Sequence, residues 1–389
     1  MSGLSGAAAI VGIGATDFSK DSGRSELRLA AEAVRAALDD AGLAPTDVDG
    51  LVSFTMDTNT EVAVARSVGI PHLKFFSRIH YGGGAACATV QQAAMAVATG
   101  VADVVVAYRA FNERSGARYG QVNTALAAQV NSSGTDNAFS YPHGLSTPAS
   151  FVAMVAQRYM HVAGATSADF GAVAVADRAH AATNPEAFFH GKPITLEDHQ
   201  NSRWIAEPLH LLDCCQESDG GVAVVVTSAE RAKDLEQTPA VIAAAAQGSG
   251  PDQYIMTSYY RDGLTGLPEM GIVGDQLWKQ AGIRPQDIAT AVLYDHFTPY
   301  VLMQLEELGF CGRGEAKDFV ADGIQVGGRL PINTHGGQLG EAYIHGMNGI
   351  AEAVRQIRGT AVNQVDDVDH VLVTAGTGVP TSGLVLSRS

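Results

Sequence analysis

The feature that most constrains the fold of this chain is an internal repeat. Residues 41–48 read AGLAPTDV and residues 281–288 read AGIRPQDI, so alanine, glycine, proline and aspartate recur at the same spacing. Each copy leads into a short apolar run, which ends at Phe54 in the first copy and at Tyr294 in the second. A repeated unit of this kind predicts two similar halves joined by a middle segment.

The elements that follow are repeated as well. Residues 85–99 are almost wholly small or apolar and end at Gly100, and residues 350–359 echo them. A helix that is apolar on all sides is buried. Buried strands are predicted at 102–108 and again at 369–374. Helices and strands therefore alternate, which predicts an α/β fold with a parallel sheet.

The repeat also predicts how the chain divides. We expect a first half over residues 1–238 and a second half over residues 239–389. Between about residues 111 and 205, asparagine, serine, tyrosine and histidine become frequent. This predicts an inserted loop segment over the sheet, which serves as a substrate lid, as a dimer interface or as both.

The charge balance narrows the class of partner. A net charge of −16 argues against nucleic acid and against an anionic membrane surface, while a locally basic pocket for a phosphorylated ligand stays compatible with it. The longest apolar runs, such as 240–246, are too short to span a bilayer. Since no basic segment followed by an apolar run opens the chain, we expect no signal peptide and a cytoplasmic protein. None of the four cysteines has metal-ligand spacing, so no metal site is predicted.

Two glycine-rich stretches carry candidate chemistry. Residues 333–346 read NTHGGQLGEAYIHG and combine four glycines with two histidines, a tyrosine and a glutamate. Glycines let a backbone approach a ligand closely, and titratable side chains on such a loop are candidates for proton transfer. Backbone N–H groups in glycine loops near helix starts are candidates for an oxyanion hole. The candidates are Gly83 and Gly84 before the buried helix, and Gly376 and Gly378 near the C-terminus.

Two further motifs bring a resemblance to a known family. Residues 218–225 read SDGGVAVV, and residues 333–337 follow the pattern N-x-x-G-G. With the repeat, these motifs resemble the thiolase superfamily, in its lipid-transfer, SCP2-thiolase-like branch. The resemblance implies two stacked five-stranded sheets in a five-layer α-β-α-β-α core. It also implies a homodimer.

The chain departs from the family pattern at the positions that carry thiolase chemistry. The family's nucleophilic cysteine falls on Gly83, and Cys87 lies one helical turn further along. The second family cysteine should fall near Thr374, where the chain has none. The family's histidine falls on Tyr343, and the asparagine or histidine of another motif falls on Tyr294.

These departures resemble one subgroup, the steroid side-chain-cleaving aldolases of sterol degradation. That resemblance implies retro-aldol cleavage of a steroid CoA thioester whose tertiary hydroxyl is β to the thioester carbonyl. The products would be a 17-ketosteroid and propionyl-CoA. It further implies a hetero-complex with a DUF35 (OB-fold) protein and no cofactor, because CoA is part of the substrate.

The residues can be assigned roles on this hypothesis. We expect Tyr294 to act as base and Tyr343 as acid, with the reverse assignment left open. A tyrosine base near pH 7 requires its pKa to fall by roughly three units, and a histidinium or a helix N-terminus would supply part of this. Asp295 would oppose that shift if it lay near the phenol, or would orient His296 or His345. Tyr254, Tyr259 and Tyr260 line either the pocket or a partner surface.

Two other functions are compatible with the pattern. One is a thiolase-like acyltransferase that uses Cys87 in a shifted register. The other is a non-catalytic acyl-CoA or lipid-binding subunit, for which the tyrosine hydroxyls would be dispensable.

Overall fold

A computed structural model of the protein describes residues 3–116, 118, 120–121, 138–253, 261, 263–321, 323–377 and 381–388. In that part of the chain a single nine-stranded sheet runs in the order β3-β2-β4-β7-β1-β8-β11-β10-β9. The first half contributes β1 (Ala8–Ala15), β2 (Gly50–Phe54), β3 (Phe75–Ile79), β4 (Val104–Asn112) and β7 (Asp219–Ser228). The second half contributes β8 (Ala240–Gly248), β9 (Thr290–Val292), β10 (His370–Ala375) and β11 (Thr381–Ser387).

The strand order confirms the two related halves. The two halves meet at the neighbouring strands β1 and β8. Outwards from there, the order β8-β11-β10-β9 of the second half corresponds to the order β1-β7-β4-β2 of the first, which has β3 as an additional edge strand. The counterpart of β3 is reduced to one bridge between Ala291 and Ile332. The halves meet where β1 and β8 pair antiparallel at Ala9–Val241 and Ile10–Ala240. The expected pair of separate five-stranded sheets is therefore one continuous sheet of five and four strands.

The prediction of a parallel sheet was wrong in part. Pairs β2–β3, β2–β4 and β9–β10 are parallel. Pairs β4–β7, β1–β7, β1–β8, β8–β11 and β10–β11 are antiparallel. In the first half, helices α2 (Glu61–Val68) and α3 (Ala86–Ala98) separate the parallel strands along the chain. Strands β10 and β11 follow each other without a helix between them, as antiparallel neighbours can.

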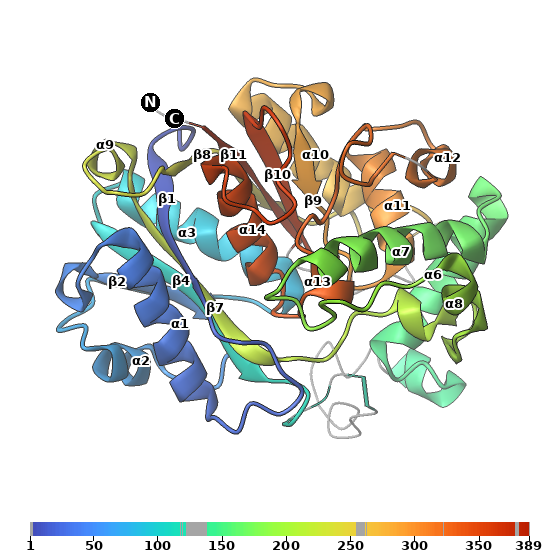
Figure 1. The fold of residues 1–389 in the computed structure, drawn as a ribbon, viewed down its shortest axis with the longest axis horizontal. Coiled ribbons are helices and arrows are strands. Elements are labelled where there is room, and N and C mark those ends of the chain that lie inside the picture. The colour runs from blue at the N-terminus through green and yellow to red at the C-terminus, as the bar shows by residue number, and fades with distance from the viewer. Residues whose placement is uncertain are drawn as a thin grey trace.

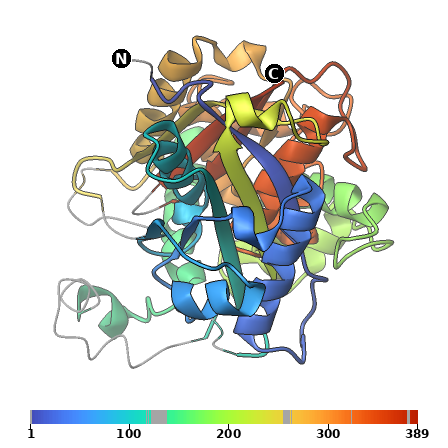
Figure 2. The ribbon, with the colours of Figure 1, turned by 90° about the vertical axis from the view of Figure 1, so that its left-hand side faces the viewer.

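The layers follow the prediction. Helices α3 (Ala86–Ala98) and α14 (Met347–Arg358) lie in the middle and pack against strands of both halves (Figure 1). Helices α1 (Glu26–Ala41) and α2 (Glu61–Val68) cover the outer face of the first half and lie toward the viewer in Figure 2. Helices α10 (Pro268–Ala281) and α11 (Thr298–Glu307) cover the outer face of the second half. The expected five-layer α-β-α-β-α core is thus confirmed.

The repeated sequence has a structural reason. Asp47 Oδ2 accepts the Ala44 N–H at 2.9 Å, and in the second half Asp287 Oδ2 accepts the Arg284 N–H at 2.8 Å. Each aspartate closes a 3₁₀ turn between a helix and the strand that follows. The glycine before each turn ends its helix with φ near +65°, a conformation that favours glycine.

The inserted segment packs over the second half. It contains the helices α6 (Pro148–Ala163), α7 (Ser167–Thr183) and α8 (Leu196–Asn201). A hairpin of β5 (Trp204–Ala206) and β6 (Leu209–His210) follows at its C-terminal end. A Cβ on Gly336 or Gly340 would lie 2.5 or 2.6 Å from Ala181 Cβ, so α7 presses directly on the glycine-rich loop. The insertion therefore helps to hold that loop in place.

Short helices complete the chain: α9 (Ala229–Ala232), α12 (Ala316–Val320) and α13 (Gly337–Gly340). The expected boundary between residues 238 and 239 lies in the loop between α9 and β8. Within the described ranges, no helix is both long enough and apolar enough to cross a bilayer.

Candidate active site

Two tyrosines from the second half meet at the centre of the molecule. Tyr294 follows β9, and Tyr343 lies in the loop between α13 and α14. The Tyr294 hydroxyl donates to the Tyr343 hydroxyl across 3.2 Å, and the rings stand edge to face with centroids 6.5 Å apart. Tyr294 is buried and Tyr343 is half-buried, so the pair has an inner and an outer member.

The Tyr294 hydroxyl occupies the space above Gly83, at the start of the buried helix. A Cβ built on Gly83 would lie 1.5 Å from Tyr294 Oη. Gly346 has φ +87°, and a Cβ there would lie 3.0 Å from Tyr294 Cε2. Any side chain at position 83 would therefore displace the phenol, which is confined on both sides by glycines.

Two buried polar residues fix the backbone of Tyr294. The Tyr294 N–H donates to Thr374 Oγ1 at 2.9 Å, and the Gln304 side-chain amide donates to the Tyr294 carbonyl at 2.9 Å. The Thr374 hydroxyl donates to Gln304 Oε1 at 2.6 Å, which closes the triangle. Neither residue was predicted as part of the site, because neither belongs to a titratable motif.

The glycine candidates for an oxyanion hole converge from two segments. A Cβ on Gly376 would lie 2.2 Å from Gly84 Cα, so the loop after β10 touches the start of the buried helix. The Ser382 hydroxyl donates to the Gly84 carbonyl at 2.5 Å and ties β11 to the same turn. Gly83, Gly84 and Gly376 thus lie together beside Tyr294, whereas Gly378 lies outside the described residues. Tyr254, Tyr259 and Tyr260 also lie outside them.

His345 lies against Tyr343 as a neutral, oriented ring. Arg109 Nε donates to His345 Nδ1 at 3.1 Å, and Arg109 also pairs with Asp57 at 3.3 Å. The imidazole stacks on Phe111 at 4.8 Å and meets the Tyr343 ring edge-on at 5.1 Å. Burial, followed by the Arg109 charge, lowers the pKa of His345 well below its usual range.

His296 is neutral as well. Its ring lies 4.7 Å from Tyr294 and stacks on Tyr300 at 5.1 Å. Burial lowers the pKa of His296 to about 3. The expectation that a histidinium depresses a tyrosine pKa is therefore wrong. Burial instead raises the pKa of both Tyr294 and Tyr343 well above 10, so both are neutral phenols at rest.

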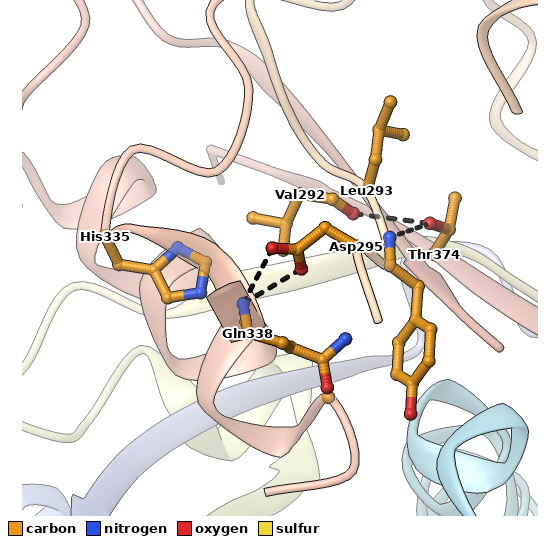
Figure 3. A pocket seen from close by; sticks show the side chains of 9 residues that line it. Val292, Leu293, Asp295, His335, Gln338 and Thr374 are labelled. Carbon is orange, nitrogen blue, oxygen red and sulfur yellow. Dashed lines mark hydrogen bonds between the residues drawn. The ribbon is translucent and has the colours of Figure 1, made fainter. Parts of the chain in front are cut away.

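Asp295 was expected either to lie near the phenol or to orient His296 or His345, but its carboxylate binds backbone N–H groups instead. Its carboxylate accepts the Gln338 N–H at 2.9 Å (Figure 3). It also accepts the Leu339 N–H at 3.1 Å, so both donors lie in α13, within the glycine-rich stretch 333–346. Burial, and then the Asp295 charge, raise the pKa of Asp177 well above its usual range. Asp295 also borders a cavity of about 10 Å³, near the size of one water molecule. Its role is to fix the loop that carries Tyr343.

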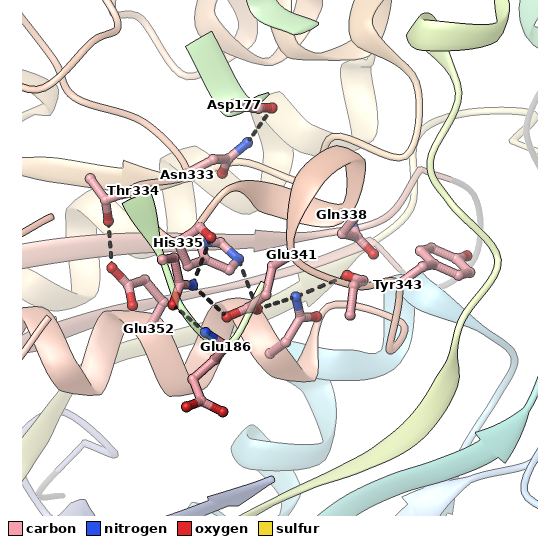
Figure 4. Close-up of polar contacts among 12 residues, drawn as sticks. Asp177, Glu186, Asn333, Thr334, His335, Gln338, Glu341, Tyr343 and Glu352 are labelled. Atoms are coloured by element: carbon pink, nitrogen blue, oxygen red, sulfur yellow. Dashed lines mark hydrogen bonds and ion pairs between the residues drawn. The ribbon is translucent and has the colours of Figure 1, made fainter. Parts of the chain in front are cut away.

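A network of buried polar side chains holds the glycine-rich stretch 333–346 in place (Figure 4). Asn348 Nδ2 donates to Glu341 Oε2 at 2.9 Å, and Asn184 Nδ2 donates to the His335 carbonyl at 3.0 Å. The Thr334 hydroxyl donates to a Glu352 carboxylate oxygen at 2.6 Å. His335 and Glu341 are therefore loop-fixing residues that lie away from the tyrosine hydroxyls, as Figure 4 shows for Glu341 and Tyr343.

Two further titratable residues lie near the pair and were not predicted. Glu113 is buried just after β4, and a negative charge on it would add to the effect of burial in raising the pKa of both tyrosines. A negative charge on Cys215 would likewise raise the pKa of both tyrosines. The Cys215 N–H donates to the His296 carbonyl at 2.9 Å. A glutamate directly after an apolar strand was the available signal for Glu113, whereas Cys215 had none.

Comparison with known proteins places this geometry in context. The chain matches the family model "Thiolase, N-terminal domain" over residues 8–230 and the model "Thiolase C-terminal domain-like" over residues 255–388. A 17-hydroxy-3-oxo-4-pregnene-20-carboxyl-CoA lyase of Mycobacterium tuberculosis is 78% identical over 384 residues, which cover 98% of this chain and 100% of that protein. A steroid side-chain-cleaving aldolase of Thermomonospora curvata is 71% identical over 387 residues, 99% of each chain.

Two solved structures resemble this chain in fold. An Ltp2-ChsH2(DUF35) aldolase superimposes with a TM-score of 0.95 at 70% identity and covers 99% of this chain and 98% of that one. Human mitochondrial 3-ketoacyl-CoA thiolase superimposes with a TM-score of 0.70 at 16% identity over the full length of both chains. The second likeness concerns the fold alone.

Proposed function

The chain belongs to the thiolase family, and we propose that within this family it is an aldolase, a carbon–carbon lyase that cleaves a 17-hydroxy steroid CoA thioester. Its products would be a 17-ketosteroid and propionyl-CoA. Relatives at 78% and 71% identity bear the names of a lyase and an aldolase acting on this class of side chain. The observation that carries the proposal is the tyrosine hydroxyl pair directly above Gly83.

The hydroxyl pair allows proton transfer without a phenolate at rest. Tyr294 accepts the proton of the substrate hydroxyl as it passes its own proton to Tyr343, and Tyr343 passes a proton to the α-carbon. The C17–C20 bond breaks, and its electron pair moves into the thioester as an enolate that the arriving proton quenches. Protons and electrons balance, so the step requires no cofactor and no covalent intermediate.

The contact between the two hydroxyls supports Tyr294 as base and Tyr343 as acid. As Tyr294 loses its proton, its oxygen accepts a hydrogen bond from the Tyr343 hydroxyl, which lowers the pKa of Tyr294 relative to burial alone. The same contact raises the pKa of Tyr343, which keeps it protonated. This order agrees with the assignment made from the family pattern.

Backbone N–H groups of the converging glycines would stabilise the enolate oxygen. The segment Gly83–Ala85 leads into α3, whose N-terminus favours negative charge. The backbone at Gly376, just after β10, lies in contact with the backbone at Gly84. We propose that the backbone N–H groups of Gly83, Gly84 and Gly376 form the oxyanion hole for the thioester.

The test is product analysis of the assembled enzyme. We propose that the active form is a complex with a DUF35 protein, since the aldolase with a TM-score of 0.95 contains such a partner. Co-expressed complex should convert a 17-hydroxy C22-CoA steroid to equal amounts of ketosteroid and propionyl-CoA in mass spectra. Release of free CoA instead, or no change in the substrate, would contradict the proposal. We place the complex in the cytoplasm because the four thiols are free.

Cys87 separates the aldolase from an acyltransferase. Its side chain is fully buried, its thiol donates to the Val373 carbonyl at 3.7 Å, and burial raises its pKa well above its usual range. Such a thiol is a poor nucleophile. Cys87→Ala should therefore retain retro-aldol activity, at a stability cost of about 1 kcal/mol. Loss of turnover in a folded C87A protein would favour the acyltransferase.

The sheet edge supports a homodimer. In the described chain β3 pairs only with β2, so its other edge is open, and Phe76 on it is 62% exposed. We propose that a second copy covers this edge. Phe76→Asp should shift the protein to monomers in light scattering. Val62→Asp, at a 71% exposed residue of α2, is the matched control and should stay dimeric.

A further inference from the structure

Glu113 is a buried carboxyl that the proton path above does not use. It directly follows β4, and its side chain is 3% exposed. The next residues are fixed by Asp219, whose Oδ1 accepts the N–H groups of Arg114 and Ser115 at 2.9 and 3.0 Å. Glu113 is therefore held in place by the backbone around it.

One serine connects Glu113 with the tyrosine loop. The register of β4 and β7 pairs Asn112 with Asp219, which brings Glu113 opposite Ser218. The Ser218 N–H donates to the Glu113 carboxyl. The Ser218 hydroxyl accepts the Tyr343 N–H at 3.2 Å. Glu113 and Tyr343 thus flank the same residue.

The charges around Glu113 do not compensate a carboxylate. The titratable groups that face it are Lys20, Arg109, Cys215, Glu217, Tyr294 and Tyr343. Lys20 Nζ donates to Gln216 Oε1 at 2.9 Å, and Arg109 pairs with Asp57. Among the residues that the structure describes, neither cation forms an ion pair with Glu113.

One oxygen of the carboxyl is unsatisfied. Within the described ranges Glu113 Oε2 has no hydrogen-bond partner. A buried carboxylate that lacks an ion pair and a full set of donors favours its neutral form. Burial, and then the Glu217 charge, raise the pKa of Glu113 well above its usual range, in agreement with this geometry.

We propose that Glu113 is a positioning residue that must be protonated for turnover. A negative charge beside Tyr294 and Tyr343 would oppose the negative charge that develops on their oxygens and on the enolate. Ionisation of Glu113 would therefore end activity on the alkaline side. The inference rests on the retro-aldol function proposed above.

The pH profile of kcat/KM tests this role, from about pH 6 to about pH 10. In Glu113→Gln the residue cannot ionise. The midpoint of the alkaline fall in kcat/KM should therefore move to a higher pH, by about one unit or more. Glu217→Gln should move it down, because loss of that charge lowers the pKa of Glu113. Glu269→Gln, at a carboxyl of α10 that is 4% exposed, is the matched control and should leave the midpoint unchanged.

The outcomes are distinguishable. Normal ketone formation with an unshifted midpoint in E113Q, or a folded E113Q that is inactive at every pH, overturns the role of Glu113. If E113Q does not fold, an unshifted or raised midpoint in E217Q overturns it. A wild-type complex that forms no ketone overturns the proposed function, and this inference with it.

Discussion

Tyr294→Phe and Tyr343→Phe are each expected to lower kcat by about 10²- to 10⁴-fold, with little change in KM. Each substitution removes one hydroxyl of a two-member proton path and leaves the ring in place. If the hydroxyls act as one relay, the double variant should lose little more than either single variant. Steady-state formation of the 17-ketosteroid by the complex with its partner measures the effect.

The control is another buried tyrosine. Tyr108 in β4 is fully buried and packs toward the outer helices of the first half, away from the hydroxyl pair. Tyr108→Phe should turn over at nearly the wild-type rate. If Tyr294→Phe and Tyr343→Phe also turned over normally, the hydroxyls would have no catalytic role, and the non-catalytic alternative would gain support.

Gly83→Ala is expected to inactivate the enzyme almost as fully as loss of the Tyr294 hydroxyl. The new Cβ would lie 1.5 Å from Tyr294 Oη, and Gly346 prevents the ring from moving aside freely. Overpacking of this kind costs about 1–3 kcal/mol, so the midpoint of thermal unfolding should also fall. Gly83→Cys should behave in the same way and should not create a thiolase, because the phenol occupies the space of the thiol.

Gly263→Ala is the matched control, since a Cβ there would meet no atom of the described residues within 4 Å. It should alter neither turnover nor the unfolding midpoint. A Gly83→Ala enzyme with normal turnover would show that the Tyr294 hydroxyl is not required at its observed position.

The position of the tyrosine pair could be predicted because both residues lie at fixed intervals from repeated landmarks. Tyr294 closes the apolar run that follows the AGIRPQDI copy, just beyond the end of β9, and Tyr343 follows the glycine pair of the loop. The layers could be predicted for a similar reason, since helix 85–99 has no polar face and must be buried. Spacing along the chain was sufficient in both cases.

The electrostatics of the site could not be predicted in this way. The pKa values of His296 and His345 depend on burial by segments from both halves, and no local pattern reports that. Asp295 was expected near the histidines because of its place in sequence, yet its carboxylate turns to the backbone at Gln338. The resemblance to the thiolase superfamily implied two five-stranded sheets. Their union into one sheet could not be predicted, because the β1–β8 pairing involves only two residue pairs and has no sequence signal.

The most direct test of proton transfer without a thiol is turnover in D₂O. In the proposed mechanism the enolate takes its proton from the two tyrosine hydroxyls, which exchange with solvent. Propionyl-CoA formed in D₂O should therefore carry a single deuterium at its α-carbon in mass spectra, with one ketosteroid formed per propionyl-CoA and no CoA thiol released. Unlabelled propionyl-CoA, or free thiol in proportion to the ketosteroid, would contradict the mechanism.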